Sequence, residues 1–410
     1  MAVSEIHGMM QFKYNITFTT LLITGVLFTL LTGCQDNGSN PVLPGDETGT
    51  IRVDIITTGL SQDSDGYSVL LDGSSSIDAD AVDVIFFSDI ETGVHTAEVT
   101  GVQSNCSVAG DQSQTANVMA ADTVTVMFEI VCRRRLVNQL VFASNRTGDF
   151  EDFELYIMNA DGSDPVALTQ NGFINLYPDI SPDGTRVLYT RLASLGAEEF
   201  QIRVMDADGT NDRAITAVNN SRDHLPAWSP DGTQILFTTD RDGNEEIYRM
   251  NADGSNQINV SRSDSIDHTP SWSPDGTQIT FVSARDGYLE VYIANTDGTG
   301  LIKLTDDTAP KFSPQWSPDG SKIIFNSTVN ANNDIYMINS DGTGLVQLTN
   351  SPQSDNSPVW SADGTEIAFV TDRDGNTEIY KMRVDGAGLP VNLSAHPAGE
   401  YTPSWSPVQE

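Results

Sequence analysis

The sequence predicts an all-β protein, in which a six-bladed β-propeller follows a small immunoglobulin-like β-sandwich. A Ser-Pro-Asp-Gly tetrapeptide, or a close variant of it, recurs along the chain at intervals of 48, 44, 44, 44 and 45 residues. Within each interval, short segments alternate apolar and polar residues between clusters of turn formers. Repeats of 40 to 50 residues with strand content are typical of propeller blades. Before the repeats, residues 50–134 show the same alternation without a helical period.

The N-terminal residues predict export and lipid anchoring. Residues 14–33 form an uncharged apolar run behind Lys13, short for a membrane span and typical of a signal peptide. The run ends in Leu-Thr-Gly-Cys34, which resembles the lipobox of bacterial lipoproteins, whose cysteine thiol receives a diacylglyceryl group. We therefore expect a lipoprotein signal peptide over 1–33, lipidation of Cys34 and a flexible linker over 34–49. The alternative is an ordinary signal peptide that contains a cysteine.

The residue after the lipobox cysteine bears on the destination. In enterobacterial lipoproteins, a residue other than Asp at this position implies transfer to the outer membrane, and here it is Gln35. This resemblance implies an exported protein anchored to the bacterial outer membrane, on its periplasmic or surface face. The lipid anchor is then the only expected contact with the membrane.

Residues 50–134 carry six or seven short predicted strands, which favours a β-sandwich. Two of the three cysteines, Cys106 and Cys132, fall in strand-like segments of this domain. In an exported chain such a pair favours a disulfide over a metal site, which needs more ligands nearby. Acidic residues also cluster in the turns of this domain. We expect them to be turn formers, with calcium loops as the alternative; they are Asp63, Asp65, Asp78, Asp80 and Asp83.

One repeat of the propeller, over 135–410, shows how a blade is built. Residues 270–273 predict a short inner strand, and the Pro-Asp-Gly that follows predicts a tight turn. Residues 277–283, 290–294 and 301–305 predict the other three strands of an antiparallel sheet. All five tryptophans occupy one position of the repeat, and a tyrosine recurs on the third strand. We expect these rings to form the core between adjacent sheets rather than a ligand site; they are Trp228, Trp272, Trp316, Trp360, Trp405, Tyr156, Tyr248, Tyr292, Tyr336 and Tyr380.

The two ends of the repeat region complete each other. The first repeat has three strands over 139–169 but no inner strand before them, whereas the last has only an inner strand over 403–406. Together they make one four-stranded blade. The sequence therefore predicts a ring of six blades closed by three strands plus one, which removes two exposed sheet edges.

The net charge limits the classes of partner. The chain has 57 acidic and 21 basic residues, a formal net charge of −36. Binding to nucleic acid requires clustered basic residues, so we expect none. An acidic surface instead suits solubility, a divalent cation or a basic partner. We expect a monomer that binds an envelope protein or peptide.

Binding residues are expected at the mouth of the central channel, where loops lead from each outer strand to the next inner strand. Variable residues held there by rigid sheets are typical of recognition. The positions two and three residues before each inner-strand proline mix aromatic and charged groups. The predicted binding residues are Asp223, His224, Asp267, His268, Lys311, Phe312, Asp355, Asn356, Glu400 and Tyr401. The alternative is that these residues only cap the inner strands.

Metal sites are weaker alternatives, and no cofactor is expected. His224 and His268 occupy equivalent positions on neighbouring blades and could hold a divalent metal together with Asp223 and Asp267. The segment from Asp240 to Glu246, and its counterpart over 372–378, has spacing similar to a calcium loop. Both lack the later bidentate ligand, so we expect turn chemistry there.

The repeat resembles that of TolB-type propellers. The shared pattern is Pro-x-Trp-Ser-Pro-Asp-Gly-x-x-Ile-x-Phe, then Arg-Asp-Gly-Asn-x-Glu-Ile-Tyr, then Asp-Gly and Leu-Thr, over residues 137–407. This resemblance implies a six-bladed propeller that binds an envelope protein or peptide. The family's best-known member is a periplasmic component of the Tol–Pal system, and this chain departs from it in carrying a lipobox and a β-sandwich domain. Similar repeats occur in oligogalacturonate lyases, which hold manganese through histidines, and in prolyl-oligopeptidase-like peptidases.

The predicted function is therefore non-catalytic binding. The chain has no Gly-x-Ser-x-Gly elbow and no glycine-rich phosphate loop. One alternative is a metal-dependent glycan lyase or hydrolase on the propeller scaffold, which depends on His224 and His268. The other is a structural or adhesive surface lipoprotein, suggested by the β-sandwich and the linker.

Overall fold

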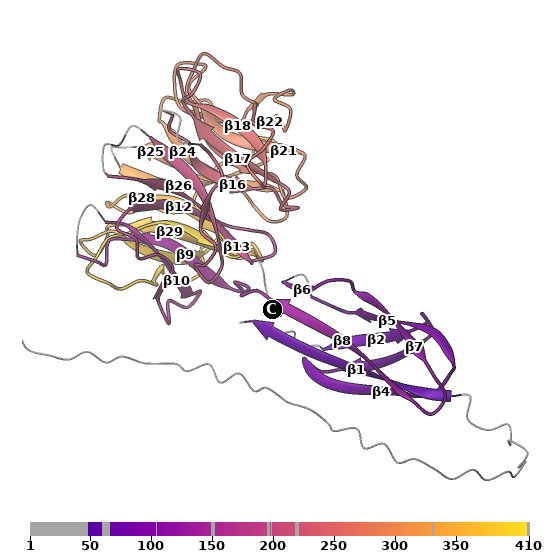
Figure 1. Ribbon diagram of the computed structural model, residues 1–410. Helices are drawn as coiled ribbons and strands as arrows, with labels where there is room; N and C mark the ends of the chain where they lie inside the picture. Colours follow the sequence, from indigo (N-terminus) through magenta and orange to yellow (C-terminus); the bar gives the residue numbers. More distant parts are fainter. Residues whose placement is uncertain are drawn as a thin grey trace, which may run out of the picture. The chain divides into compact units, whose positions relative to one another are not determined.

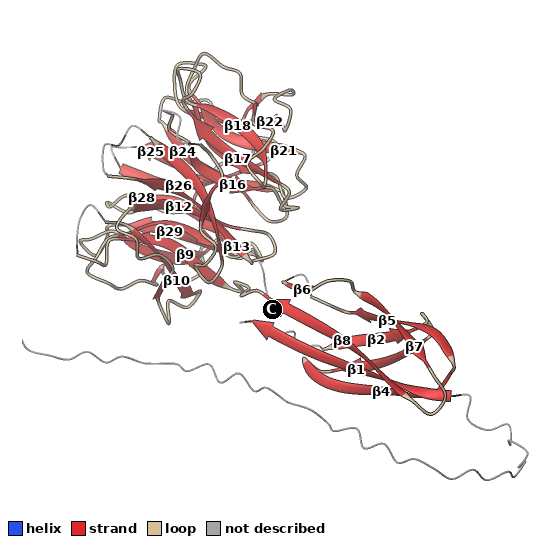
Figure 2. Cartoon of the chain, in the orientation of Figure 1, coloured by secondary structure: helices blue, strands red, loops and turns tan. Residues whose placement is uncertain are grey.

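The computed structural model describes residues 48–407, except for 60–65, 104, 149–151, 195–196, 198, 218–220 and 330–331. All regular elements of the described residues are strands (Figure 2), so the predicted all-β class is confirmed. The described part of the chain contains no helix that is long and apolar enough to cross a membrane. The predicted signal peptide, Cys34, Asp63 and Asp65 lie outside the described residues.

The N-terminal domain is a sandwich of two four-stranded sheets. The first sheet has the order β4-β1-β8-β6 and contains β1 (Thr48–Gly59), β4 (Val82–Glu91), β6 (Cys106–Val108) and β8 (Thr123–Cys132). The second has the order β3-β2-β5-β7 and contains β2 (Tyr67–Leu71), β3 (Ser75–Ala79), β5 (Gly93–Thr100) and β7 (Ser113–Val118). Only β1 and β8 pair in parallel. Alternate residues of these strands, such as Val53, Val69 and Phe128, fill the space between the sheets.

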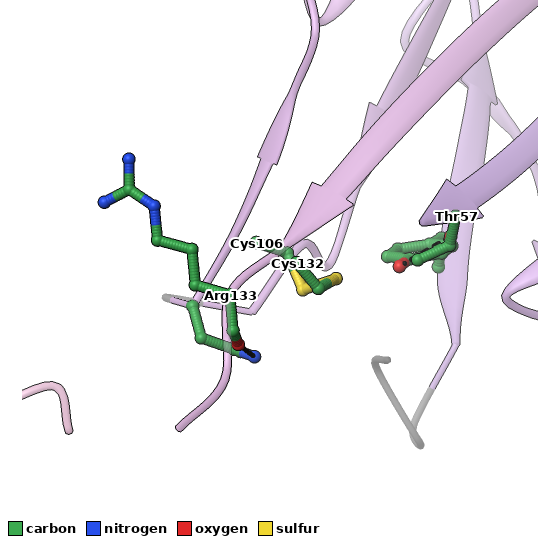
Figure 3. Close-up of a disulfide and its surroundings, with 6 residues drawn as sticks. Thr57, Cys106, Cys132 and Arg133 are labelled. Atoms are coloured by element: carbon green, nitrogen blue, oxygen red, sulfur yellow. Dashed lines mark hydrogen bonds between the residues drawn. A yellow bond between two sulfur atoms is a disulfide. The ribbon is translucent and has the colours of Figure 1, made fainter. Parts of the chain in front are cut away.

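The predicted disulfide is confirmed. Cys106 and Cys132 face each other in the antiparallel pairing of β6 with β8, and their sulfur atoms are bonded (Figure 3). Two of the acidic residues expected to be turn formers, with calcium as the alternative, have hydrogen-bond partners within the protein, and for Asp78 the partner lies on the neighbouring strand. Asp78 accepts a hydrogen bond from the Ser68 hydroxyl at 2.6 Å, and Asp83 accepts one from the Val84 amide at 2.7 Å.

The rest of the chain forms six four-stranded antiparallel sheets (Figure 1). Five of them use four consecutive strands each, from the innermost to the outermost. They are β12 (Ile174–Ile180), β13 (Arg186–Leu192), β14 (Phe200–Asp206) and β15 (Arg213–Ala214); β16 (His224–Trp228), β17 (Gln234–Thr239), β18 (Glu246–Asn251) and β19 (Ile258–Asn259); β20 (Asp267–Trp272), β21 (Gln278–Ser283), β22 (Glu290–Asn295) and β23 (Ile302–Lys303); β24 (Lys311–Trp316), β25 (Lys322–Val329), β26 (Asn332–Asn339) and β27 (Val346–Gln347); and β28 (Asp355–Trp360), β29 (Glu366–Thr371), β30 (Glu378–Arg383) and β31 (Val391–Asn392).

The sixth sheet joins the two ends of the propeller. Its order is β11-β10-β9-β32, with β9 (Gln139–Ser144), β10 (Glu154–Asn159), β11 (Val166–Ala167) and the C-terminal β32 (Glu400–Trp405). β32 pairs antiparallel with β9, from Glu400 opposite Ser144 to Trp405 opposite Leu140. The predicted closure by three strands plus one is confirmed.

The repeated aromatic residues lie in the core between adjacent sheets, as expected. The five tryptophans are 6 to 9% exposed. Trp272, for example, packs with Leu236 and Ile247 of the preceding sheet, and Trp405 with Ala368 and Ile379. Within five sheets, a tyrosine of the third strand packs against a phenylalanine of the second, with ring centroids 5.8 to 6.2 Å apart.

Loss of the closing tryptophan tests how far closure stabilises the ring. Trp405→Ala removes a buried indole at the junction of the two chain ends, and we expect it to lower the free energy of unfolding by about 3–5 kcal/mol. All five tryptophans are in the propeller, so denaturant titration followed by the emission of the remaining four reports this domain. Leu389→Ala removes a side chain that is 87% exposed and should change stability by less than about 0.5 kcal/mol. Equal effects of the two substitutions would contradict a stabilising role of closure.

Candidate functional site

The innermost strand of every sheet contains the same backbone irregularity. The residue before the proline has a positive φ of 46 to 53°, and the strand pairing shifts register there, as in a β-bulge. None of these residues is glycine; they are Tyr177, Leu225, Thr269, Ser313, Ser357 and Thr402. Such backbone conformations cost energy and are found preferentially where a structure has a functional constraint. Here the bulge lies on the axis of the ring in all six sheets.

These residues line a central cavity of about 520 Å³. Its wall comes from the innermost strands of all six sheets, from the bulge to the turn that follows the strand. The turns contribute Pro182, Pro230, Pro274, Pro318, Ala362 and Pro407. The five tryptophans also reach the wall, so each of them both packs between sheets and borders the cavity.

Asp179 is the only charged side chain among the residues described as lining this cavity. Its Oδ2 accepts a hydrogen bond from the backbone N–H of Trp228 at 2.7 Å, and the Ser404 side chain is a second hydrogen-bonding partner. Burial raises the pKa of the Asp179 carboxyl from 3.8 to about 7. The equivalent residues of the other blades are uncharged; they are Ala227, Ser271, Gln315, Val359 and Ser404.

Asp179 is not among the predicted binding residues, although its place in the repeat distinguishes it in the sequence. It is the only acid at the position between the inner-strand proline and the tryptophan, and it occurs in the one blade where Ile180 replaces that tryptophan. In the sequence alone, an aspartate three residues before a Pro-Asp-Gly turn resembles the many turn-forming aspartates of this chain. Only the fold shows that it faces the channel.

The uncharged members of the predicted binding set lie at the opposite ends of the inner strands, outside the cavity wall. The rings of His268 and Phe312 stack with centroids 6.4 Å apart, and the His224 ring meets Phe200 edge-on at 5.6 Å. Tyr401 likewise meets Phe153 edge-on at 5.4 Å. The contacts of His224 and His268 join neighbouring blades, whereas the contact of Tyr401 lies within the closing blade. Their role in binding stays a prediction.

The charged members of that set are buried, and this corrects their placement on an accessible mouth. Asp223, Asp267, Asp355 and Glu400 are each 0% exposed, and Lys311 is 2% exposed. Each acid pairs with an arginine of the turn between the second and third strands of its own sheet, at 2.8 to 3.0 Å. The arginines are Arg241, Arg285, Arg373 and Arg146, respectively. Lys311 instead contacts Asp307 at 2.5 Å and Glu290 at 3.5 Å. The four acid–arginine pairs each tie the start of the first strand of a sheet to the turn of the same sheet, and the contact of Lys311 with Glu290 joins neighbouring sheets.

The alternative metal ligands have other partners in the structure. The described residues contain no group of three or more His, Cys, Asp or Glu side chains that could hold a metal ion. The Nδ1–H of His224 donates a hydrogen bond to the Arg222 carbonyl oxygen, 3.0 Å away. Burial lowers the pKa of His224, and burial together with His224 lowers that of His268 to about 4, so both are neutral at pH 7.

Turn chemistry occupies the segment with calcium-like spacing. Asp242 accepts a hydrogen bond from the Tyr248 hydroxyl, and the Asn244 amide donates to the carbonyl oxygens of Ser263 and Ser265 at 3.0 and 2.9 Å. Glu246 accepts a hydrogen bond from the Ser263 amide at 3.1 Å. The expectation of turn chemistry agrees with these contacts.

Comparison with known proteins identifies the family. The TolB beta propeller domain matches residues 133–311 and 303–410, more than half of the chain. The chain belongs to the TolB β-propeller family. A protein TolB homolog of Chlorobaculum tepidum is 33% identical over 152 residues, which are 36% of this chain and 32% of that protein. A Tol-Pal system protein TolB of Thioalkalivibrio sulfidiphilus is 36% identical over 80 residues, 19% of this chain and 18% of that protein. This chain therefore matches about a third or less of these relatives' length.

Solved structures agree with the fold. The TolB structure from Acinetobacter baumannii superposes with a TM-score of 0.58 at 22% identity, over 66% of this chain and 66% of that chain. The hydrazine synthase of Kuenenia stuttgartiensis superposes with a TM-score of 0.55 at 16% identity, over 67% of this chain and 47% of that chain. Because proteins as different as TolB and a hydrazine synthase share this fold, the fold alone does not give the function of a TolB-family propeller, which depends on its site.

The raised pKa of Asp179 predicts a stability that depends on pH. A carboxyl whose folded pKa is about 7 stabilises the fold fully only below pH 3.8 and loses this contribution as the pH rises through 7. Asp179→Asn keeps a side-chain acceptor and removes that loss. Each pKa unit is worth about 1.4 kcal/mol of stability. Because Asp179 is partly exposed, solvent screens part of this cost, and we expect the variant to be about 2 kcal/mol more stable at pH 8.5. At pH 5 the gain should be small.

Thermal unfolding of the full chain at both pH values measures this difference. The matched control is Asp264→Asn, which neutralises an exposed acid of the same domain and should leave the melting temperature nearly unchanged at either pH. If Asp179→Asn is destabilised equally at pH 5 and pH 8.5, ionisation of the Asp179 carboxyl does not lower the stability of the fold as expected.

Proposed function

We propose that this TolB-family chain is a non-catalytic, lipid-anchored envelope protein whose propeller binds a protein or peptide partner. The observation that carries the proposal is the central cavity. Its wall comes from six inner strands that share prolines and, in five of them, a tryptophan, and that differ in the residues on either side of the inner-strand proline. Rigid scaffolds that present variable residues are typical of recognition sites. A cavity of about 520 Å³ can hold a few side chains of a partner segment.

The wall chemistry supports binding to a peptide. Tryptophan and proline rings supply apolar surface, while the hydroxyls of Thr269, Ser271 and Thr402 supply donors and acceptors beside them. Few charges need to be desolvated when a segment enters, because Asp179 is the only charged residue of the described wall. One relative is named as a protein of the Tol-Pal system, and we propose an envelope partner of comparable kind for this chain.

Capture from envelope extracts tests the partner. The full chain, immobilised through its C-terminus, should retain at least one envelope protein above a bare-resin control. Ser271→Tyr fills the cavity from the wall and should reduce retention at least tenfold. Val346→Tyr adds the same ring to β27, where Val346 is 47% exposed, and should retain the partner as the unchanged chain does. The proposal fails if the unchanged chain retains nothing, or if Ser271→Tyr and Val346→Tyr retain the same proteins equally.

Lipid anchoring needs a separate test, because Cys34 lies outside the described residues. Cells that express the full chain and are fed an alkyne-bearing fatty acid should yield labelled protein in the outer-membrane fraction. Cys34→Ser should abolish the label and release the protein from the membrane. Cys132→Ser, which removes a different cysteine, should keep the label. Labelling that persists in Cys34→Ser would exclude anchoring at this residue.

A further inference from the structure

We propose that the central cavity binds a cationic side chain, the ammonium of a lysine or the guanidinium of an arginine on a partner segment, with Asp179 as its counter-ion. The inference depends on the proposed function and names the chemistry that the partner must present. Three properties of the cavity support it: an acid without a cation, a wall suited to an organic cation, and the scarcity of ligands for a metal.

Asp179, which is partly exposed, differs from the buried acids of the inner strands. Asp223, Asp267, Asp355 and Glu400 each have an arginine of their own sheet within 3.0 Å. The partners of Asp179 are a backbone N–H and a serine hydroxyl, and no cation lines the described cavity wall. A buried carboxylate is costly unless it is paired. The chain therefore places an acid at the cavity for which the described wall supplies no cation.

The groups around Asp179 give no internal countercharge. Tyr177, on the same strand, is the other residue of the described wall that titrates near neutral or alkaline pH, and burial raises its pKa, so it stays neutral. From the neighbouring inner strands come Trp228 and Ser404. The guanidinium of Arg186 lies 4.5 Å from the centre of the Trp228 ring, but Arg186 is not part of the cavity wall. A cation for Asp179 must come from outside the propeller.

The rest of the wall favours an organic cation. Five tryptophans border the cavity, and indole rings attract ammonium and guanidinium groups through their π electrons. The hydroxyls of the wall can accept N–H hydrogen bonds, and the methylene groups of a lysine or arginine can pack on the prolines. The chain's net charge of −36 also raises the local concentration of basic segments.

A metal ion or an anion fits the cavity less well. Calcium takes six to eight oxygen ligands and usually several carboxylates, whereas the described wall offers one carboxylate. An anion would need basic side chains, and the described wall has none. Among the simple classes of charged ligand, a single organic cation matches this cavity.

Binding can be measured by tryptophan emission, because all five tryptophans border the cavity. The probes are the capped tripeptides acetyl-Gly-Lys-Gly-amide and acetyl-Gly-Arg-Gly-amide, titrated into the full chain at pH 8. The neutral control is acetyl-Gly-norleucine-Gly-amide, which has nearly the length of lysine without its charge. We expect at least one basic tripeptide to bind tenfold or more tightly than the norleucine peptide. Asp179→Asn should remove that difference, whereas Asp264→Asn should keep it.

Moving the carboxylate to another blade tests whether its exact place in the cavity matters. In the double variant Asp179→Asn/Ser271→Asp, the carboxylate moves to the equivalent position two blades along, and basic tripeptides should regain part of their advantage. At pH 5, where Asp179 is protonated, the unchanged chain should lose most of the preference for the basic peptides. The thermal unfolding of each variant shows whether it is folded.

Several outcomes would overturn the inference. One is equal binding of the lysine and norleucine peptides. Another is a preference for basic peptides that is undiminished in Asp179→Asn. A third is a calcium-dependent change in tryptophan emission that requires Asp179, while no basic peptide binds. Binding of n-butylammonium as tightly as the lysine peptide would point to a free amine and contradict a partner segment. If envelope capture succeeds equally with Asp179→Asn, partner binding stands and the cationic contact fails, so the two proposals can be told apart.

Discussion

The pairing of β32 with β9 is the constraint on which the propeller depends. It joins residues that are more than 250 positions apart, and several kinds of contact reinforce it. Arg146 pairs with Glu400 at 2.9 Å, the Gly399 amide donates to the Asn145 side chain at 2.7 Å, and the Ser406 hydroxyl donates to the Leu136 carbonyl at 2.6 Å. The cavity exists only because this pairing brings all six inner strands around one axis. An open array would expose two sheet edges and would have no enclosed wall.

Within the ring, the features that repeat build the scaffold, and the exceptions carry the specificity. The arginine of the turn after the second strand lies over the phenylalanine and tyrosine rings of its own sheet and pairs with the first-strand acid, as in Arg285 with Phe281, Tyr292 and Asp267. Where the acid is replaced by Lys311, Val329 stands at the position of the arginine. The two partners of the ion pair were lost together, as expected if a buried acid without its arginine is unfavourable. In the cavity wall the prolines and tryptophans repeat, whereas the residues on either side of the inner-strand proline change from blade to blade.

The sequence predicted the fold well because each blade repeats the same physical signals. Tryptophan at one position, a tight turn after it and alternating strands specify a sheet, and the incomplete repeats at the two ends specify closure. The site was harder to predict. The bulge before each proline breaks the alternation of side chains along the inner strand, so the sequence could not show that Asp223 and His224, at adjacent positions, are both buried. Asp179 was missed for the same reason, because its direction depends on a bulge that leaves no distinctive residue type at the bulged position.

The bulge also explains why a single acid can matter in this cavity. A positive φ at a residue other than glycine is unfavourable, yet all six inner strands adopt it, so the packing of the ring must hold it in place. That rigidity fixes the wall before any partner arrives, which lowers the entropy lost on binding. Asp179 lies beside Ile180, the one position where the ring of tryptophans is interrupted by a smaller side chain. A cationic side chain that entered along this blade would meet the carboxylate next to the position where the other blades carry an indole, so we expect the missing tryptophan and the added acid to act together in recognition.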